Sequence, residues 1–554
     1  MRGKIYSSIV VICLIFLFGA CQQKTTPVKN QVIEQKVEEL ISKMTLEEKI
    51  GQMCQINGAH GTLPADLREA IKEGKIGSIL NEVNADTINE IQRIAIEESR
   101  LGIPVLIARD VIHGFKTVFP IPLGLAATWN PELVQKGAAV AAAEAWSSGV
   151  KWTFSPMIDI SRDARWGRIA ESFGEDPYLT SLLGAAMVKG YQGDDLSAEN
   201  SIIACAKHFV GYGAAEGGRD YNTTLIPPRE LRDVYLPPFK SAVDAGVRTF
   251  MSGFNDIDGV PATGNKFLFR QVLREEWQFD GFVVSDWASP WELINHGFAA
   301  DEKEAAQRSI NAGVNMEMAS TTYRENITQL LKEGLITEAT INQAVREILR
   351  VKFEAGLFDN PYVPKEKQYQ FAKAEYQEAA HQSALQSMVL LKNEQQTLPL
   401  EDHKKIALIG PMANEAYEQL GTWVFDGDST LSVTPLKGLK ETFGGDNVLF
   451  TKGLETSRTR HTKGFKKAIQ LAKQSEVIVF CAGEESILSG EAHSRANIDL
   501  PGKQNELIKE LKKTGKPLVL VVMAGRPLTI GEISQYADAV IYAWHPGSMG
   551  GADT

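Results

Sequence analysis

Charged and aromatic side chains occur in four short motifs between residues 109 and 287, where they could form one site. The motifs RDVIHGF, RWGRIAESFGEDP, KHF and SDW supply Asp110, Arg168, Lys207, His208, Asp286 and Trp287. Ionised groups form strong, directional hydrogen bonds to hydroxyls, and an indole ring offers a flat apolar face to a sugar ring. This combination of residue types favours the binding of a carbohydrate.

The cluster RWGRIAESFGEDP allows two interpretations. Arg165, Glu171 and Glu175 lie close together along the chain. They either help to bind hydroxyls or form an internal ion-pair network that braces a loop. The sequence leaves both interpretations open.

Short β-rich runs alternate with amphipathic helical stretches over residues 33–358. The expected strands are Gly51–Ile56, Ile76–Asn81, Val105–Asp110, Trp152–Asp159, Ile202–Phe209, Thr249–Asn255, Gly281–Trp287 and Val314–Met318. Helical segments between them include Asp86–Ser99, Pro228–Ala245 and Glu302–Ala312. This alternation predicts a (β/α)8 barrel of the TIM type. A doubly wound sheet is the alternative, but no glycine-rich phosphate turn follows the first strands.

Polar residues at the ends of the expected strands favour the barrel. Asp110, His208, Asn255 and Asp286 each end or directly follow an apolar run. One such residue alone could be a helix cap or a turn residue. In a barrel, however, the strand ends meet at one rim, where such enzymes carry their catalytic groups.

A second α/β unit is expected after a linker over residues 359–375, where Pro361 and Pro364 oppose helix formation. Over residues 376–554 we expect helices at Tyr376–Leu390, Gly464–Gln474 and Lys503–Lys513, and strands at Lys405–Ile409, Val477–Ala482, Pro517–Met523 and Ala539–Ala543. The sequence stops at Thr554, just after a glycine-rich turn that should lead into a helix. This domain is therefore expected to be incomplete.

The first residues have the pattern of an export signal. Arg2 and Lys4 precede a short apolar run at Ile9–Phe18, which is too short to span a bilayer comfortably. Small residues then precede Cys21, which resembles a bacterial lipoprotein cleavage site, although Phe18 stands where leucine is usual. An ordinary signal or a retained anchor helix is the alternative.

On the lipoprotein interpretation, residues 1–20 are a signal peptide, Cys21 carries lipid and residues 21–32 are a polar tether. The protein is then expected in the periplasm or cell envelope, attached to a membrane only through that lipid. Cys54, Cys205 and Cys481 remain in the mature chain, an odd and widely spaced set that predicts neither a disulfide framework nor a CxxC metal site. The formal net charge of −11 argues against nucleic acid, whose phosphates require a basic face.

The candidate site residues lie within, or close to, longer sequence motifs. In chain order they are DVIHGFKTVFPIPLGLAATWN, RWGRIAESFGEDPYL, KHFVGYG, PPFKSAVDAGV, GFVVSDW and VLLKNEQQTLPL. Through them the sequence resembles glycoside hydrolase family 3, in its periplasmic β-glucosidase branch, from about Ile33 to Thr554. The resemblance implies a barrel followed by a six-stranded α/β sandwich, with the active site between the two domains.

The resemblance also implies roles for single residues. Asp286 of SDW corresponds to the nucleophile. Glu491 in GEESILSGEAHSRANIDLPGKQ corresponds to the acid/base, with Glu484 and Glu485 as nearby competitors. The residues implied to contact the sugar are Asp110, Arg168, Lys207 and His208 as ligands of the non-reducing-end ring, Met251 in the pocket lining and Trp287 in the wall toward the next ring.

A retaining glycosidase needs an ionised carboxylate that attacks the anomeric carbon and a protonated one that donates to the leaving oxygen. Positive charge on Arg168, Lys207 and His208 is expected to lower the pKa of Asp286 and so keep it ionised. Glu491 is expected to carry the proton. No metal or organic cofactor is expected.

Two positions depart from the usual residues of the family. Phe254 stands where many members have a tyrosine whose hydroxyl can approach the nucleophile, so that bond is lost. Lys116 stands where arginine is common, so a bidentate contact becomes a single one. Neither change removes the catalytic pair.

The branch of the family that removes N-acetylglucosamine uses an Asp–His dyad shortly after the KH pair. The corresponding stretch here, GYGAAEGGRDYNTT, has no Asp-Ser-His. The sequence therefore predicts a retaining β-glucosidase that removes terminal β-D-glucosyl residues from β-linked gluco-oligosaccharides. A β-xylosidase of the same family is one alternative, and a non-catalytic glycan-binding lipoprotein is the alternative from a different class. The preferred linkage stays open.

Overall fold

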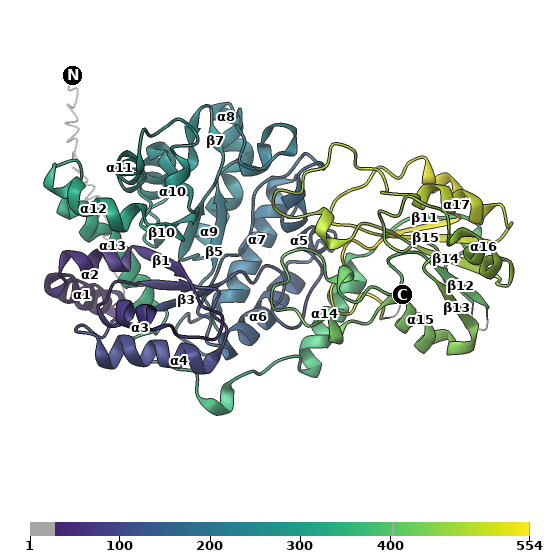
Figure 1. Ribbon diagram of the computed structural model, residues 1–554, viewed down its shortest axis with the longest axis horizontal. Coiled ribbons are helices and arrows are strands. Elements are labelled where there is room, and N and C mark those ends of the chain that lie inside the picture. Colours follow the sequence, from purple (N-terminus) through teal and green to yellow (C-terminus); the bar gives the residue numbers. More distant parts are fainter. Residues whose placement is uncertain (1–27, 402–403, 553–554) are drawn as a thin grey trace, which may run out of the picture.

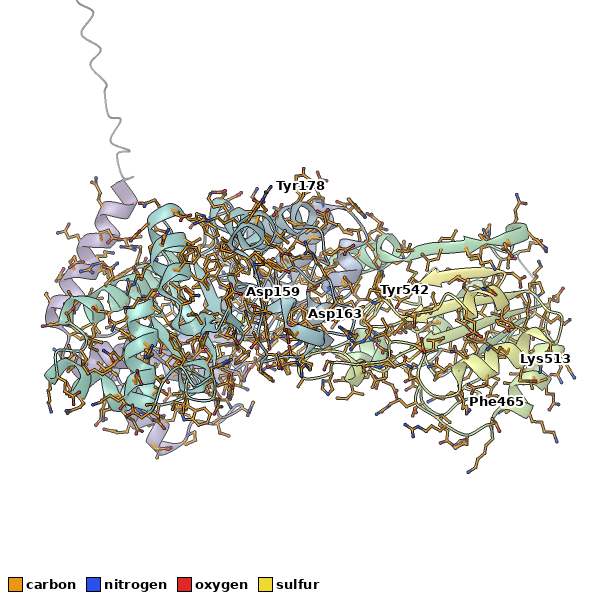
Figure 2. All side chains as sticks on the ribbon, turned by 90° about the horizontal axis from the view of Figure 1, so that it is seen from above. Asp159, Asp163, Tyr178, Phe465, Lys513 and Tyr542 are labelled. Atoms are coloured by element: carbon orange, nitrogen blue, oxygen red, sulfur yellow. The ribbon has the colours of Figure 1, made fainter. Side chains whose placement is uncertain are left out.

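The computed structural model describes residues 28–401 and 404–552 and shows two domains side by side (Figure 1). The first domain, coloured purple to teal, contains an eight-stranded sheet surrounded by helices. The second, coloured green to yellow, contains a six-stranded sheet. Seen from above, the two domains form an elongated molecule (Figure 2).

Eight parallel strands form the barrel in chain order. They are β1 Cys54–Asn57, β2 Ser78–Leu80, β3 Leu106–Arg109, β4 Trp152–Thr153, β5 Cys205–Phe209, β6 Thr249–Ser252, β9 Phe282–Trp287 and β10 Met316–Met318. Their order in the sheet is β4-β3-β2-β1-β10-β9-β6-β5. Backbone hydrogen bonds of 2.9 Å from Thr153 N to Ile203 O and from Cys205 N to Ser155 O join β4 to β5. The predicted barrel is confirmed, with strand bounds that differ by a few residues.

Burial explains why these segments form barrel strands. Every residue of β5 and β6 is buried, as expected for parallel strands whose outer face is covered by helices. β9 is buried from Phe282 to Asp286, and only Trp287 at its end is exposed. Several charged residues of these strands, Arg109, Lys207 and Asp286, lie toward the carboxyl ends, whereas the buried Gln55 and Thr249 lie further back in the barrel.

Helices cover the outside of the barrel. They are α1 Val28–Lys43, α2 Leu46–Gln52, α3 Ala65–Lys72, α4 Ala85–Arg93, α5 Pro122–Ala126, α6 Pro131–Ser147, α7 Pro177–Gln192, α8 Pro228–Glu230, α9 Pro237–Asp244, α10 Ser289–Glu292, α11 Glu302–Ala312, α12 Thr322–Lys332 and α13 Glu338–Glu354, with the π-helices η1 Ile94–Glu98, η5 Leu231–Tyr235 and η7 Phe267–Glu276. Asn84, Asn130 and Asp176 cap α4, α6 and α7 by accepting hydrogen bonds from backbone amides of the first turn. These caps define where the loops that follow β2, β3 and β4 end.

The second domain is an α/β sandwich, as the family resemblance implied. Its strands are β11 Val389–Asn393, β12 Ile406–Ile409, β13 Val448–Thr451, β14 Val477–Gly483, β15 Leu518–Met523 and β16 Ala539–Tyr542, and its helices are α14 Ala374–Ser387, α15 Pro435–Phe443, α16 Phe465–Lys473 and α17 Gln504–Lys512. The order is β11-β16-β15-β14-β12-β13, and only β11 runs antiparallel to its neighbour among the described residues. Apolar side chains form a separate core on each face of the sheet.

Three segments differ from the sequence-based expectation. Val389 and Leu390 were expected to end a helix, but α14 ends at Ser387 and the next residues pair with β16 as β11. β13 was not expected at all. Residues 28–32, expected in a polar tether, belong to α1. The predicted signal peptide and the predicted lipidation site Cys21 lie outside the described residues.

The segment 359–375 connects the domains along the outside of the barrel (Figure 1). The side chain of Asn89 in α4 bonds both the amide and the carbonyl of Val363, at 3.0 and 2.9 Å. The expected linker is therefore packed against the barrel. Cys54, Cys205 and Cys481 are buried free thiols. Within residues 28–401 and 404–552, none of the helices combines the length and apolarity needed to cross a bilayer.

Candidate active site

A cavity of about 470 Å³ lies where the carboxyl ends of the barrel strands meet loops of the second domain. Its walls are formed by His60, Leu80, Asn81, Arg109, Asp110, Phe154, Arg168, Lys207, Tyr221, Met251, Phe254, Asp286, Trp287, Glu292, Met318, Trp423, Phe425 and Glu491. Every site residue expected from the sequence is among them except His208 and the lipidation site Cys21. The arrangement brings charged residues from four barrel strand ends or the loops that follow them together with one carboxylate of the other domain.

Asp286 lies near the end of β9 and is almost completely buried. Its Oδ1 accepts a hydrogen bond of 2.7 Å from the backbone amide of Trp287. Its Oδ2 is buried and has no hydrogen-bond partner. One carboxylate oxygen is thus held by the backbone while the other is left unpaired at the wall of the cavity.

The pKa of Asp286 differs from the expectation. Its net pKa is raised to about 8: burial is the largest cause and the charge of Glu491 acts in the same direction, although Arg168 and Lys207 act in the opposite direction. The expected net lowering is therefore wrong, because the loss of hydration of a buried carboxylate outweighs the attraction of its positive neighbours.

Arg168 and His208 form a buried chain behind Asp286. Arg168, in the short helix Gly167–Glu171, makes a bidentate pair with Glu171 at 2.8 and 3.0 Å. Its Nη2 also lies 2.9 Å from His208 Nε2. A guanidinium has only donors, so Nε2 accepts and the proton of the neutral imidazole is on Nδ1. That Nδ1 donates to Asp159 Oδ2 over 2.8 Å.

The neutral state of His208 follows from its surroundings. Burial, with the positive charges of Arg168 and Lys207, holds the pKa of His208 well below its usual range. Its Nε2 is 3.6 Å from Asp286 Oδ2 and already accepts from Arg168, so it has no proton to donate to the carboxylate. In this structure His208 orients Arg168 from behind the cavity wall.

Lys207 and Asp110 face each other on the opposite wall. Lys207, in β5, donates to Asp110 Oδ1 over 3.0 Å, and Asp110 directly follows β3. Met251 from β6 is buried in the lining, and Trp287 is exposed at the rim. This pattern, an ion pair deep in the cavity and an indole at its mouth, suits a hydroxyl-rich ring that enters end first.

Glu491 reaches the cavity from an irregular loop of the second domain and keeps a quarter of its side chain exposed. Its Oε1 accepts a hydrogen bond from the hydroxyl of Tyr221, and its Oε2 lies 3.6 Å from Arg168 Nη1. Arg168 therefore contacts Glu491 on one side and, on the other, His208, whose Nε2 lies beside Asp286 Oδ2. The two carboxylates have different surroundings, one buried in the barrel and one partly hydrated on a loop.

The two competing carboxylates on that loop are used elsewhere. Glu484 is fully buried and pairs with Arg495 and, at 3.4 Å, with Arg526. Glu485 accepts from Ser457 and pairs with Arg458 at 3.1 Å. Neither carboxylate lines the cavity.

Several lining residues were missed by the sequence analysis. Trp423 and Phe425, in the segment GTWVFDGD of the second domain, close the cavity over the barrel. The Trp423 ring centroid lies 5.4 Å from the Arg168 guanidinium and 5.6 Å from Lys207 Nζ. The sequence does show two aromatic residues in a loop flanked by glycines, which could have marked them as candidate binding residues. Their position over the barrel, however, depends on how the two domains dock.

Two further missed residues are polar. Arg109 at the end of β3 pairs with Asp426 of the second domain at 2.7 Å and therefore links the two domains at the rim. Glu292, in α10, lies close enough to Glu491 to feel its charge, and burial together with this charge raises the pKa of Glu292 to about 7. Among the described residues no cluster of His, Cys, Asp or Glu could hold a metal ion.

The positions noted as departures have clear surroundings. Phe254 lines the cavity, and the ring of Tyr221 packs edge-on against it with centroids 5.1 Å apart. Lys116 lies over the rings of Phe115 and Phe371 and is not in the cavity wall. In the RWGRIAESFGEDP cluster, Arg165 pairs with Asp163 and Glu171 with Arg168, whereas Glu175 is exposed. Figure 2 shows Asp163 on the side of the barrel that faces the second domain.

Two carboxylates that reach one cavity, from the carboxyl rim of a barrel and from an α/β sandwich, fit the glycoside-cleaving class of enzyme. The comparisons agree with this class. Residues 45–351 match the glycosyl hydrolase family 3 N-terminal domain, and residues 388–554 match the family 3 C-terminal domain. The chain belongs to glycosyl hydrolase family 3.

Similar proteins have related names. A protein named periplasmic beta-glucosidase, from Salmonella typhimurium, is 40% identical over 95% of this chain and 72% of its own length. A beta-xylosidase from Formosa agariphila is 36% identical over 94% of this chain and 71% of its own length. The crystal structure of a beta-glucosidase from Listeria innocua in complex with glucose has 40% identity and a TM-score of 0.89, and the match covers 94% of this chain and 73% of that one.

Proposed function

We propose that the protein is a retaining β-glucosidase that removes terminal, non-reducing β-D-glucosyl residues from β-linked gluco-oligosaccharides. The observation that carries this proposal is the pair Asp286 and Glu491, which reach one cavity from two domains with Arg168 between them. The names of the Salmonella and Listeria relatives support glucose as the sugar.

In the proposed mechanism Asp286 attacks the anomeric carbon through Oδ2, the oxygen that has no hydrogen-bond partner. Glu491 donates a proton to the leaving oxygen and then removes a proton from the water that hydrolyses the glycosyl-enzyme. We expect the two carboxyl groups to be about 5–5.5 Å apart when both act on one substrate, as in other retaining enzymes.

The ring that reacts would be held by the charged walls of the cavity. Asp110 and Lys207 already form a pair, so each can bind a hydroxyl while the other holds it in place. Arg168 would bind a hydroxyl near the carboxylates. His208 would act through Arg168, and Trp287 would form the wall toward the second ring. No cofactor takes part in this scheme.

For the location, we propose export and a lipid anchor on Cys21, which would place the enzyme in the periplasm or cell envelope. The support is the N-terminal sequence pattern, together with a relative that is named as periplasmic.

A single set of assays tests the reaction. Nitrophenyl β-glucoside and β-xyloside are compared at equal concentration, and proton NMR follows the first sugar released from the better one. We expect faster turnover of the glucoside and initial release of the β-anomer. Faster turnover of the xyloside would favour a β-xylosidase, and initial release of the α-anomer would exclude a glycosyl-enzyme. Disaccharides with β-1,2, β-1,3, β-1,4 and β-1,6 bonds would then rank the linkages.

A further inference from the structure

The loop that carries Glu491 has no regular secondary structure between Ser489 and the start of α17 at Gln504. A general acid on such a loop needs contacts that hold its backbone, because small displacements of a catalytic group cost large factors in rate. Those contacts come from the barrel and from one buried arginine, Arg526.

Arg526 follows β15 and is completely inaccessible to solvent. Its Nη2 donates to the carbonyl oxygens of Leu488 at 2.5 Å and His493 at 2.9 Å, on either side of Glu491. A single guanidinium nitrogen therefore holds both ends of the segment that bears the carboxylate.

The other amino group of Arg526 reaches into the barrel. Its Nη1 lies within hydrogen-bond distance of the carbonyl oxygens of Ala164, Arg165 and Trp166, at 3.0, 2.9 and 3.2 Å. These residues directly precede the helix that carries Arg168. Arg526 thus connects the backbone next to Arg168 with the backbone next to Glu491, the two groups that lie 3.6 Å apart in the cavity.

The surroundings of Arg526 hold it in this position. Its Nε is 3.4 Å from the buried carboxylate of Glu484, and its carbonyl accepts from the Tyr542 hydroxyl over 2.5 Å. Figure 2 shows Tyr542 at the end of the second domain that faces the barrel. Burial lowers the pKa of Arg526 to about 10, so it stays charged at neutral pH.

Backbone contacts show how closely the two segments meet. Gly490 N donates to Gly167 O over 2.7 Å, and a Cβ on Gly167 would lie 2.1 Å from Gly490 O. On the barrel side Asp220 accepts from Ala492 N and from the Trp166 indole, both at 2.6 Å. The residue after Glu491 is therefore tied to the barrel as well.

We propose that Arg526 is a positioning residue for the acid/base: it holds the Leu488–His493 segment against the barrel so that the Glu491 carboxylate stands at the leaving-group oxygen. Asp220 supports the same segment from the barrel side. This inference rests on the proposed function of Glu491. A lysine has one nitrogen with three donors, so it cannot keep all five carbonyl contacts that the two amino groups of Arg526 make.

The test compares two leaving groups. Arg526→Lys keeps the positive charge beside Glu484 but loses the fork. We expect kcat/KM on a disaccharide to fall by about 10–100-fold, and on dinitrophenyl β-glucoside by less than about three-fold, because a good leaving group departs without a proton. Equal losses on both substrates would mean that Arg526 only supports the fold, and the proposal would be overturned. If Arg526→Lys leaves kcat/KM on both substrates unchanged, the proposal is overturned as well.

Matched variants keep the test decisive. Arg458→Lys alters another arginine–glutamate pair of the same domain, and its ratio of the two rates should equal that of the wild type. Asp220→Asn loses one of two acceptors and should change the ratio in the same direction as Arg526→Lys. If Arg526→Lys does not fold, Asp220→Asn decides alone, and an unchanged ratio there contradicts the proposal.

Glu491→Ala, measured on the same two substrates, separates this inference from the proposed function. If it shows no dependence on the leaving group, the assignment of the acid/base fails. If it shows that dependence and the ratios of Arg526→Lys and Asp220→Asn equal the wild-type ratio, only the positioning role fails.

Discussion

The two halves of the site are built in opposite ways. Asp286, Lys207 and Arg168 come from strands and a loop of the barrel and are almost fully buried, and Lys207 and Arg168 are already paired with Asp110 and Glu171. Glu491 comes from an irregular loop, is a quarter exposed, and is held across the domain interface by Tyr221 and the contacts of Arg526.

This difference suits the two tasks of the carboxylates. The nucleophile must meet one carbon atom at a fixed distance, which a strand end provides. The acid/base must protonate leaving groups of different shapes and then bind water, which a loop at the mouth of the cavity allows. In the proposed function, the barrel half would determine which sugar ring is bound, and the loop half would determine how readily its bond is cleaved.

The largest effect is expected when the carboxylate of the barrel half, Asp286, is removed. Asp286→Gly should lower kcat on an aryl glucoside by about 10⁴-fold or more, because no other carboxylate can form the glycosyl-enzyme. Circular dichroism and the thermal midpoint should stay close to those of the wild type, since the lost side chain makes one hydrogen bond, to the Trp287 amide. Near-wild-type activity would show that the nucleophile lies elsewhere.

Removing the loop half should have an effect that depends on the substrate. Glu491→Ala should lose about 10²–10⁴-fold on a disaccharide and much less on dinitrophenyl glucoside. Added azide should restore part of the rate by entering the vacated space and attacking the glycosyl-enzyme. Glu485→Ala is the control, because its carboxylate pairs with Arg458 outside the cavity; Glu484→Ala is a weaker control, because Glu484 also contacts Arg526. Azide rescue of Glu485→Ala alone would mean that the acid/base has been misplaced.

The pH dependence of kcat/KM should reflect the burial of Asp286. Asp286 must be ionised to attack, and its pKa is raised to about 8. On dinitrophenyl glucoside, whose leaving group needs no proton from Glu491, kcat/KM should therefore rise with pH up to about that value. Lys207 opposes the shift, so Lys207→Met should move this acidic limb to higher pH while lowering kcat/KM by about 10–100-fold. If kcat/KM of the wild type already levels off near pH 4, or if the profile of Lys207→Met is not shifted, this view of Asp286 is contradicted.

The smallest expected effect concerns stability. The pKa of Asp286 rises from 3.8 to about 8 on burial. Above pH 4 the unfolded chain therefore loses a proton that the folded chain keeps, and folding weakens as pH rises toward 8. Asp286→Asn should remove this penalty and increase the free energy of unfolding by about 1–3 kcal/mol at pH 8, with little change at pH 4. Denaturant titration at both values measures it.

Asp110→Asn is the matched control for stability. Asp110 pairs with Lys207 at 3.0 Å, so its replacement should bring no gain at pH 8. An equal gain in both variants would mean that the effect is not specific to the unpaired oxygen of Asp286.

The difference between the two halves also explains what the sequence could predict. The barrel and its polar strand ends follow from local patterns, because a run such as GFVVSDW contains both the buried strand and the carboxylate at its end. Trp423, Tyr221 and Arg526 could not be predicted in this way, since each enters the site only when the two domains dock. β11 was missed because Val389 and Leu390 continue an apolar pattern that a helix would also show.

Electrostatics was the other limit of the sequence analysis. Positive residues near Asp286 are visible in the motifs, but the loss of water around it depends on the closed barrel and on the domain above it. Asp159, which orients His208, was also missed, because it lies outside the recognised motifs although it ends an expected strand.

The most direct test of a barrel nucleophile and a loop acid/base is to trap the glycosyl-enzyme. A 2-deoxy-2-fluoro-β-glucoside with a dinitrophenyl leaving group reacts once and is then hydrolysed slowly, because the fluorine destabilises the oxocarbenium-like transition state of both steps. Mass spectrometry of the digested protein should find the fluorosugar on the peptide that contains Asp286, in the wild type and in Glu491→Ala alike. A label on the peptide of Glu491 or Asp110 would contradict the account.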